Sequence, residues 1–242
     1  MLIKGLQKLT LLDYPDRLAC TVFVGGCNFR CPFCHNASLV LPELYGETIP
    51  TEEFFAFLAS RAGRLEGVCV SGGEPTMMAD LADFIRRIKS MGFLVKLDTN
   101  GSHPDVLRQL IDENLLDYVA MDIKNSPEKY EQTAMPLTRG EVTPQVAERE
   151  SGIIERMKES VDILKEGKVP YEFRTTVMRE LHSPEDMAKI GRWLSGAERY
   201  FLQNYRPEGD LIVGGFTSLT PEEMQELLSE AKRYIPTAAI RG

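Results

Sequence analysis

Three cysteines, Cys27, Cys31 and Cys34, stand at a CxxxCxxC spacing in a loop that contains glycine and proline. Three thiolates at this spacing can ligate three irons of a cubane 4Fe–4S cluster and leave the fourth iron open. Proteins that use such a cluster only for electron transfer normally supply four cysteines. The missing fourth ligand therefore indicates that a small molecule completes the coordination of the cluster.

Two simpler interpretations compete with the cluster. Cys27, Cys31, Cys34 and His35 could form a Cys₃His zinc site. However, Cys34 and His35 are adjacent, which makes shared tetrahedral ligation awkward, and no second ligand pair follows at zinc-knuckle spacing. A disulfide is less expected still, because nothing marks the chain as secreted.

The two remaining cysteines, Cys20 and Cys69, lie in apolar, strand-like runs. We expect both to be small buried hydrophobic residues. They are too few to hold a second cysteine-ligated cubane cluster. The chain therefore predicts a single iron–sulfur centre.

Composition limits the classes of function. The 242 residues, 43% of them hydrophobic, can bury the core of one α/β barrel-like domain or of two small ones. The net charge of -8 and the pI of about 5.1 argue against a nucleic-acid surface and an anionic membrane surface. The N-terminus lacks the pattern of a signal peptide, and no apolar run is long enough to span a bilayer. We expect a cytoplasmic protein with neither nucleic-acid nor membrane partners.

Strand-like and helix-like runs alternate along the chain, which predicts a parallel sheet with helices outside. The expected strands are residues 18–24, 67–71, 93–97, 118–123, 171–178 and 200–202. The expected helices begin at a Thr51 cap, span 81–91, 105–114 and 153–167, begin after a Ser183 cap, and span 221–234 after a Thr220 cap. Residues 124–149 are polar and weakly periodic, and we expect a long functional loop there.

This order of elements predicts a single domain, residues 1–242, of the α/β class with a partial TIM-like (β/α)₆ barrel. Its core covers about residues 18–207. The N-terminal segment 1–17 and a C-terminal helix, 220–235, are expected to pack on that core.

Polar motifs fall where the expected strands end, which is where barrels of this type carry their chemistry. Ser71-Gly72-Gly73-Glu74-Pro75, Asp98-Thr99-Asn100-Gly101 and Met121-Asp122-Ile123-Lys124 end three strands, and Arg174 lies in a fourth. Each motif is weak alone, since Asn-Gly, for example, is a common turn dipeptide. Their joint placement with the cysteines at one barrel mouth indicates an active site.

Asp98 and Asp122 end adjacent expected strands, so their carboxylates could converge. Two close carboxylates repel each other and raise one pKa unless a cation lies between them. Hard cations prefer such oxygen ligands. The alternative is that each aspartate caps the turn that follows it.

Together these motifs resemble the radical S-adenosylmethionine superfamily, and within it the glycyl-radical-enzyme activating enzymes. The opening Leu6-Gln7-Lys8-Leu9-Thr10-Leu11-Leu12-Asp13-Tyr14-Pro15 is similar to the branch of anaerobic ribonucleoside-triphosphate reductase activating proteins, and pyruvate formate-lyase activating enzyme is the best-known relative. The resemblance covers about residues 5–207. It implies reductive cleavage of S-adenosylmethionine to a 5′-deoxyadenosyl radical, which abstracts hydrogen from a glycine of a partner glycyl radical enzyme. A flavodoxin- or ferredoxin-like protein would donate the electron.

The resemblance also assigns residues to roles. The cluster ligands are Cys27, Cys31 and Cys34. The cofactor contacts are Phe33, Cys34, His35, Asn36, Gly72, Gly73, Glu74, Thr99, Asn100, Asp122, Lys124, Gln203 and Asn204, with Gly72, Gly73 and Glu74 on the methionine amino group. A monovalent cation beside the methionine carboxylate would be held by Asp98, Thr99, Asp122 and the carbonyl of Ala120. Asp13, Lys124 and Arg174 are the candidate catalytic residues, with Asp13 meeting the substrate glycine loop.

One departure concerns the sixth strand, where a family member carries a histidine and this chain has Gln203 to Tyr205. Two other functions remain open. One is a small-molecule radical S-adenosylmethionine enzyme, such as 7-carboxy-7-deazaguanine synthase. The other is a zinc-binding interaction protein without catalysis, which would leave the polar residues at the strand ends without a purpose.

Overall fold

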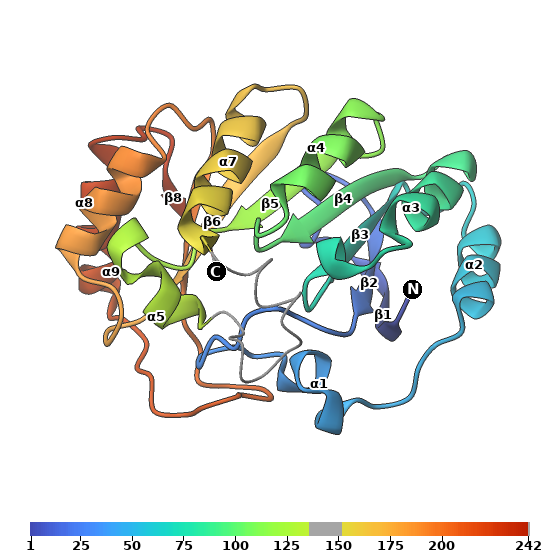
Figure 1. The fold of residues 1–242 in the computed structure, drawn as a ribbon, viewed down its shortest axis with the longest axis horizontal. Coiled ribbons are helices and arrows are strands. Elements are labelled where there is room, and N and C mark those ends of the chain that lie inside the picture. The colour runs from blue at the N-terminus through green and yellow to red at the C-terminus, as the bar shows by residue number, and fades with distance from the viewer. Residues whose placement is uncertain (136–151, 242) are drawn as a thin grey trace.

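The computed structural model describes residues 1–135 and 152–241, which form one curved sheet with helices along its outer side (Figure 1). The sheet holds eight strands in chain order. They are β1 (Ile3–Thr10), β2 (Ala19–Val24), β3 (Gly67–Gly72), β4 (Leu94–Thr99), β5 (Tyr118–Asp122), β6 (Tyr171–Val177), β7 (Tyr200–Asn204) and β8 (Ala239–Ile240). Strands β2 to β8 run parallel, while β1 is antiparallel to β2.

The six expected strands are confirmed as β2 to β7, each within two residues of its predicted bounds. The structure adds β1 and β8, one at each edge of the sheet. Residues 3–10 belong to the N-terminal segment 1–17, which the sequence analysis expects only to pack on the core. Pairing with β2 makes this segment a strand, with Ile3 opposite Val24 and Thr10 opposite Ala19.

The longer helices are α2 (Thr51–Ser60), α3 (Leu81–Ser90), α4 (Pro104–Asp112), α7 (Ile153–Lys165), α8 (Pro184–Trp193) and α9 (Pro221–Lys232). Ser183 and Thr220 cap α8 and α9 as predicted, each in a capping box with an acidic residue of the first turn. The Thr51 cap was wrong. Thr51 is the first helical residue, Pro50 occupies the cap position, and no side chain caps α2.

The prediction of a loop over residues 124–149 is wrong at its start, since a short 3₁₀ turn, Pro127–Lys129, leads into α5 (Tyr130–Ala134). The buried side chains of α5 include Tyr130 and Thr133, and the helix is too short to show a periodic pattern. Residues 136–149 of that predicted loop lie outside the described residues. A second short helix, α1 (Ala37–Val40), follows the cysteine loop.

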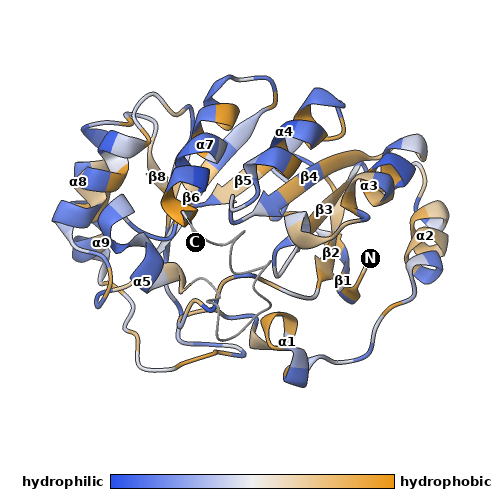
Figure 2. Ribbon diagram, in the orientation of Figure 1, coloured by the Kyte–Doolittle hydropathy of each residue, from blue (hydrophilic) through white to orange (hydrophobic). Residues whose placement is uncertain are grey.

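The apolar core lies between the sheet and the helices, whose outer faces are hydrophilic (Figure 2). Cys20 is fully buried in this core, and Cys69 is fully buried outside it, with its Sγ 3.8 Å from Lys96 Nζ. Both cysteines are buried, as predicted. None of the helices in the described ranges is long and apolar enough to cross a membrane.

The sheet does not close on itself. In the part of the chain that the structure describes, β1 pairs with β2 and is bridged to Ile49 through Ile3, β8 pairs with β7, and β1 and β8 do not pair with each other. The predicted partial barrel is therefore confirmed, and the sheet stays open between β1 and β8.

Candidate functional site

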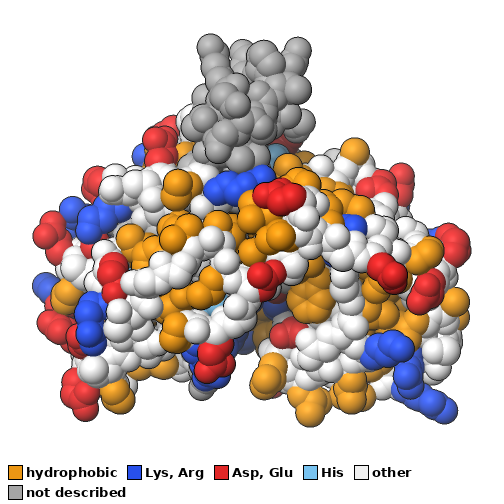
Figure 3. Space-filling view, turned by 90° about the horizontal axis from the view of Figure 1, so that it is seen from below, with side chains coloured by type: hydrophobic (Ala, Val, Ile, Leu, Met, Phe, Trp, Pro, Cys, Tyr) orange, Lys and Arg blue, Asp and Glu red, His pale blue; other side chains and the backbone are white. Residues whose placement is uncertain are grey.

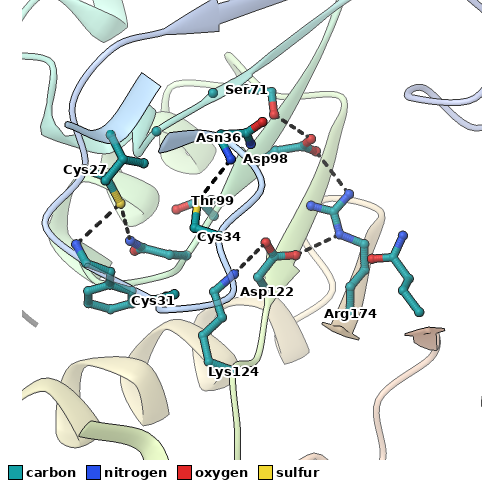
Figure 4. Close-up of a pocket in the computed structure, with 16 residues that line it drawn as sticks. Cys27, Cys31, Cys34, Asn36, Ser71, Asp98, Thr99, Asp122, Lys124 and Arg174 are labelled. Carbon is teal, nitrogen blue, oxygen red and sulfur yellow. Dashed lines mark hydrogen bonds and ion pairs between the residues drawn. The ribbon is translucent and has the colours of Figure 1, made fainter. Parts of the chain in front are cut away.

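A cavity of about 270 Å³ lies at the carboxyl ends of the parallel strands (Figure 4). Its walls come from the cysteine loop and from the ends of β3, β4, β5, β6 and β7. Of the residues predicted for the site, these line it: Cys27, Cys31, Cys34, Asn36, Gly72, Gly73, Asp98, Thr99, Asn100, Asp122, Lys124, Arg174 and Gln203. The structure thus brings together most of the motifs that the sequence places at strand ends.

The three cysteines carry free thiols at the edge of this cavity. The backbone N–H of Phe29 donates to Cys27 Sγ (3.4 Å), and that of Asn36 donates to Cys34 Sγ (3.4 Å). Burial raises the pKa of all three thiols, that of Cys31 to about 12. Bound metal would displace these protons, because the thiolate is the ligand form. Donors aimed at two sulfurs stabilise that thiolate form, so this loop fits a cluster held by three cysteines.

His35 does not complete a zinc site with the cysteines. Its Nε2 donates to the carbonyl oxygen of Arg206 (2.6 Å), and its ring stacks on Tyr205 with centroids 5.1 Å apart. Among the described residues, no group of three or more His, Cys, Asp or Glu side chains is arranged to hold a single metal ion. With His35 engaged by Arg206 and Tyr205, the fourth ligand of a Cys₃His zinc site is not supplied.

A segment that sequence reasoning missed covers the cysteine loop from outside. The backbone N–H of Val213 donates to Pro32 O (2.9 Å), and that of Ala37 donates to Asp210 O (2.9 Å). The Asp210 carboxylate also accepts from Ser38 N at 2.7 Å. Asp210 and Val213 follow the expected core, which was placed at about residues 18–207. No local sequence pattern predicts their hydrogen bonds to the cysteine loop.

Gly72 and Gly73 line the cavity, but their close approach is to the protein backbone. A Cβ added at Gly73 would lie 1.9 Å from Gly26 O, and one at Gly72 would lie 2.4 Å from Val24 N. The Gly73 amide donates to Val24 O (2.9 Å) rather than pointing freely into the cavity. The two glycines therefore let the end of β3 press against the start of the cysteine loop.

Glu74 lies elsewhere than expected. Its side chain is fully buried and is not among those that line the cavity. Oε1 accepts from Thr76 N (3.1 Å), Thr76 Oγ1 (2.5 Å) and Thr99 Oγ1 (2.7 Å), and Oε2 accepts from Asn100 N (2.6 Å). This arrangement does not support the expected contact with a methionine amino group. The carboxylate instead joins the turn after β3 to the turn after β4.

A chain of alternating charges crosses the floor of the site (Figure 4). Lys124 Nζ lies 3.1 Å from Asp122 Oδ2, and Arg174 Nε lies 2.9 Å from Asp122 Oδ1. Arg174 Nη1 then lies 3.6 Å from Asp98 Oδ1, which also pairs with Lys96. Burial alone would raise the pKa of both aspartates, but Arg174 and the neighbouring lysines outweigh it and hold each pKa below its usual value. Both carboxylates are therefore ionised, with Arg174 between them.

The remaining predicted residues fall outside this cavity. Asn204 is held by Leu219, since its Nδ2 donates to Leu219 O (2.8 Å) and its Oδ1 accepts from Leu219 N (2.9 Å). Phe33 is buried edge-on against Phe216, and Ala120 lies inside β5. Asp13 lines a neighbouring cavity.

Phe29, Val40 and Ser71 line the cysteine cavity without having been assigned a role. Ser71 belongs to the motif that ends β3, so its position in the sequence could have identified it as a cavity residue. Phe29 and Val40 are apolar residues near the cysteines, and nothing in their local pattern marks them.

Comparison with known proteins decides the family. Residues 21–194 match the Radical SAM superfamily. The chain belongs to the radical SAM superfamily. It is 34% identical, over 99% of its own length and 95% of the relative's, to a candidate glycyl-radical enzyme activating enzyme of Methanocaldococcus jannaschii. It is also 31% identical to the pyruvate formate-lyase-activating enzyme of Listeria monocytogenes, over 53% of this chain and 55% of that one.

Solved structures show the same fold. SuiB of Streptococcus suis bound to its precursor peptide superposes with a TM-score of 0.65 at 13% identity, over 92% of this chain and 48% of SuiB. The present chain thus spans about half of SuiB. QueE of Escherichia coli superposes with a TM-score of 0.54 at 16% identity, over 99% of this chain and 92% of QueE.

Membership of the superfamily makes this radical SAM protein an oxidoreductase enzyme whose cofactors are a 4Fe–4S cluster and S-adenosylmethionine. Cys27, Cys31 and Cys34 are the residues that would hold the cluster. The cavity beside them is bordered by polar groups on several strand ends, which suits the amino-acid part of the cofactor.

Proposed function

We propose that this enzyme activates a glycyl radical enzyme by removing one hydrogen atom from the Cα of a glycine in that partner. Similarity along nearly the full length of the Methanocaldococcus jannaschii relative supports the proposal, as does the activating-enzyme name of the Listeria relative. The feature of the structure that carries it is the open side of the barrel.

A second cavity, of about 680 Å³, occupies that open side. The connection between β1 and β2 provides one wall, and β6, β7 and the end of the chain after β8 provide much of the other. Its lining comprises Leu11, Leu12, Asp13, Pro15, His35, Arg174, Thr176, Gln203, Asn204, Arg206 and Arg241. It meets the cysteine cavity at Arg174 and Gln203, which line both. A loop of another protein can therefore approach the cofactor site from the side.

The rim of the second cavity is apolar and exposed. Leu11 and Leu12 are 72% and 88% exposed, and Leu9, on β1, is 56% exposed. Large apolar side chains grouped at a surface mark contacts with other proteins. On the face seen from below, apolar side chains gather in a broad band and the surface is hollowed (Figure 3). A macromolecular substrate accounts for this rim better than a small polar one.

Asp13 stands where an entering loop would pass. Its Oδ2 accepts a hydrogen bond from the Thr21 hydroxyl, which fixes the carboxylate at the cavity wall. A carboxylate in that position can accept hydrogen bonds from the backbone N–H groups of a glycine-containing segment. We assign to Asp13 the orientation of the substrate loop.

The chemistry divides between the cofactors and the chain. When bound, the reduced cluster and S-adenosylmethionine supply methionine and a 5′-deoxyadenosyl radical. Lys124 lines the cavity beside Cys31 and Cys34 and can bind the methionine carboxylate, while Arg174 holds Asp122 in place. The walls exclude water and stray hydrogen donors. The glycine loses a hydrogen atom rather than a proton, so no side chain is required as a base. We assign electron supply to a flavodoxin- or ferredoxin-like donor.

Electron paramagnetic resonance tests this proposal after anaerobic mixing of the reduced enzyme, S-adenosylmethionine and a candidate glycyl radical enzyme. A glycine-centred radical on the partner is the expected product. In a variant carrying both Leu11→Asp and Leu12→Asp, we expect the rate of partner activation to fall by about tenfold or more, because interface centres tolerate charge poorly. Cleavage of S-adenosylmethionine without partner should be unchanged.

Leu44→Asp is the matched control, since Leu44 is 47% exposed and does not line the second cavity. It should activate the partner as the wild type does. Full activation of the partner by the Leu11→Asp and Leu12→Asp double variant would contradict the proposal that the partner docks on the rim of the second cavity. If S-adenosylmethionine is cleaved with turnover of a small molecule and not of a partner protein, the enzyme belongs to the small-molecule class of radical SAM enzymes.

A further inference from the structure

The family resemblance places a monovalent cation between Asp98 and Asp122, yet the oxygens of Asp98 are already engaged by the chain itself. Oδ1 pairs with Lys96 Nζ and lies 3.6 Å from Arg174 Nη1. Oδ2 accepts from the Ser71 hydroxyl at 2.9 Å. A metal ion would have to compete with a lysine, an arginine and a hydroxyl for this carboxylate.

Asp122 is engaged in the same way. Its Oδ1 accepts from Arg174 Nε (2.9 Å), and its Oδ2 accepts from Lys124 Nζ (3.1 Å). A third proposed ligand, Thr99, is also occupied. Its Oγ1 donates to Glu74 Oε1 and accepts from Gly101 N at 3.0 Å. The residues present therefore do not fit the cation.

Charge leads to the same conclusion. Three cations, Lys96, Arg174 and Lys124, surround two carboxylates, Asp98 and Asp122, and leave one net positive charge. Lys96 is 1% exposed, so solvent and salt screen its charge only weakly. A further cation placed here would meet a positive rather than a negative site.

We propose that this enzyme needs no monovalent cation, and that Lys96, together with Arg174, supplies the positive charge beside the two aspartates. The surplus charge then lies on Lys124, at the cavity, where the methionine carboxylate would neutralise it. Lys96 does not line the cavity, so it acts through Asp98 as a positioning residue. The inference rests on the cofactor binding in the proposed function and is independent of the choice of partner.

The test measures S-adenosylmethionine affinity by anaerobic calorimetry on the enzyme with its cluster reconstituted. Titrations are made in sodium chloride, potassium chloride and choline chloride at equal ionic strength. For the wild type we expect dissociation constants that agree within about twofold. Binding about tenfold tighter in sodium or potassium than in choline would overturn the inference. No binding in any of the three salts would contradict the proposed function instead.

Lys96→Met provides the second arm. Removing this charge leaves two cations against two carboxylates and frees one oxygen of Asp98, so a requirement for sodium or potassium should appear, with affinity about tenfold weaker in choline. Lys89→Met is the control, because Lys89, on α3, also pairs with an aspartate, Asp117 (2.6 Å), but does not line the cavity or contact a residue that lines it in this pair. It should bind the cofactor equally in all three salts.

Circular dichroism shows whether Lys96→Met is folded, and Lys96→Gln replaces it if it is not. A folded Lys96 variant that binds equally well in all three salts would overturn the role of Lys96. The wild-type titrations do not depend on either variant, so they decide the cation requirement on their own.

Discussion

Replacing Glu74 separates two roles for this carboxylate, namely a direct contact with the cofactor and a link between two turns. Glu74 is fully buried and accepts four hydrogen bonds, two of them from backbone N–H groups, of Thr76 and Asn100. In Glu74→Ala the hydroxyls of Thr76 and Thr99 can rotate toward other acceptors. The two N–H groups cannot, and each unsatisfied donor costs about 1–3 kcal/mol.

The two orphaned donors together cost about 2–6 kcal/mol. Part of this is offset, because burial raises the pKa of Glu74 and its removal relieves the desolvation of a carboxylate. Water that enters the vacated space offsets more. We therefore expect Glu74→Ala to lower the free energy of unfolding by about 2–3 kcal/mol, a large effect for one substitution.

Urea titration of the reduced apoprotein measures this change, and calorimetry on the reconstituted enzyme measures cofactor affinity. Both should fall together in Glu74→Ala, because the Thr99–Asn100 turn lines the cavity and loses its anchor. Glu53→Ala, on the exposed first turn of α2, is the control and should change stability by less than about 0.5 kcal/mol. A Glu74→Ala protein that keeps its stability but loses cofactor binding would refute the linking role and restore the direct contact.

Two further predictions follow from the same geometry. Cys34→Ala should abolish reconstitution of the cluster, read as iron and labile sulfide content, while Cys69→Ala should keep it; a Cys69→Ala protein that cannot be reconstituted would show that the ligands are misassigned. Burial lowers the pKa of His182, whose Nδ1 accepts from Met178 N (3.3 Å) and whose Nε2 donates to Lys124 O (2.9 Å), so the folded state favours the neutral ring. The stabilisation from the neutral His182 ring is complete above the unfolded pKa of about 6.5 and is lost as the pH falls below it. Between about pH 7.5 and 5.5 the wild type should therefore lose more unfolding free energy than His182→Gln. Equal losses for the two proteins in urea titrations would contradict this.

Several residues that the sequence places at strand ends line one cavity, and their convergence has a geometric reason. In a parallel sheet the carboxyl ends of neighbouring strands meet at one edge, so Asp98 and Asp122, 24 positions apart, must lie near each other. The register places Asp122 opposite Arg174 on β6 in the same way. The strand pattern does not predict which residues each of these side chains contacts.

The contacts of Glu74, Asn204 and Lys96 are examples that the strand pattern does not predict. Glu74 follows Gly73, which packs against Gly26, and its carboxylate accepts hydrogen bonds from Thr99 and Asn100 in the turn after β4. Asn204 is satisfied by Leu219, which no periodicity connects with β7. Lys96 would be expected on a surface, and it is buried only because Asp98 and Cys69 lie beside its ammonium group.

The sequence by itself predicted the three cysteines as cluster ligands, and it determined the six central strands and the edge of the sheet at which the polar motifs gather. These features depend on local spacing and on hydrophobic runs, which a linear sequence displays directly. Only the tertiary structure decided that β1 and β8 end the sheet without pairing with each other, that residues 210–213 bond to the cysteine loop, and that the chain's own cations pair with Asp98 and Asp122. Each of these depends on contacts between distant residues, where burial and electrostatic pairing outweigh any local preference.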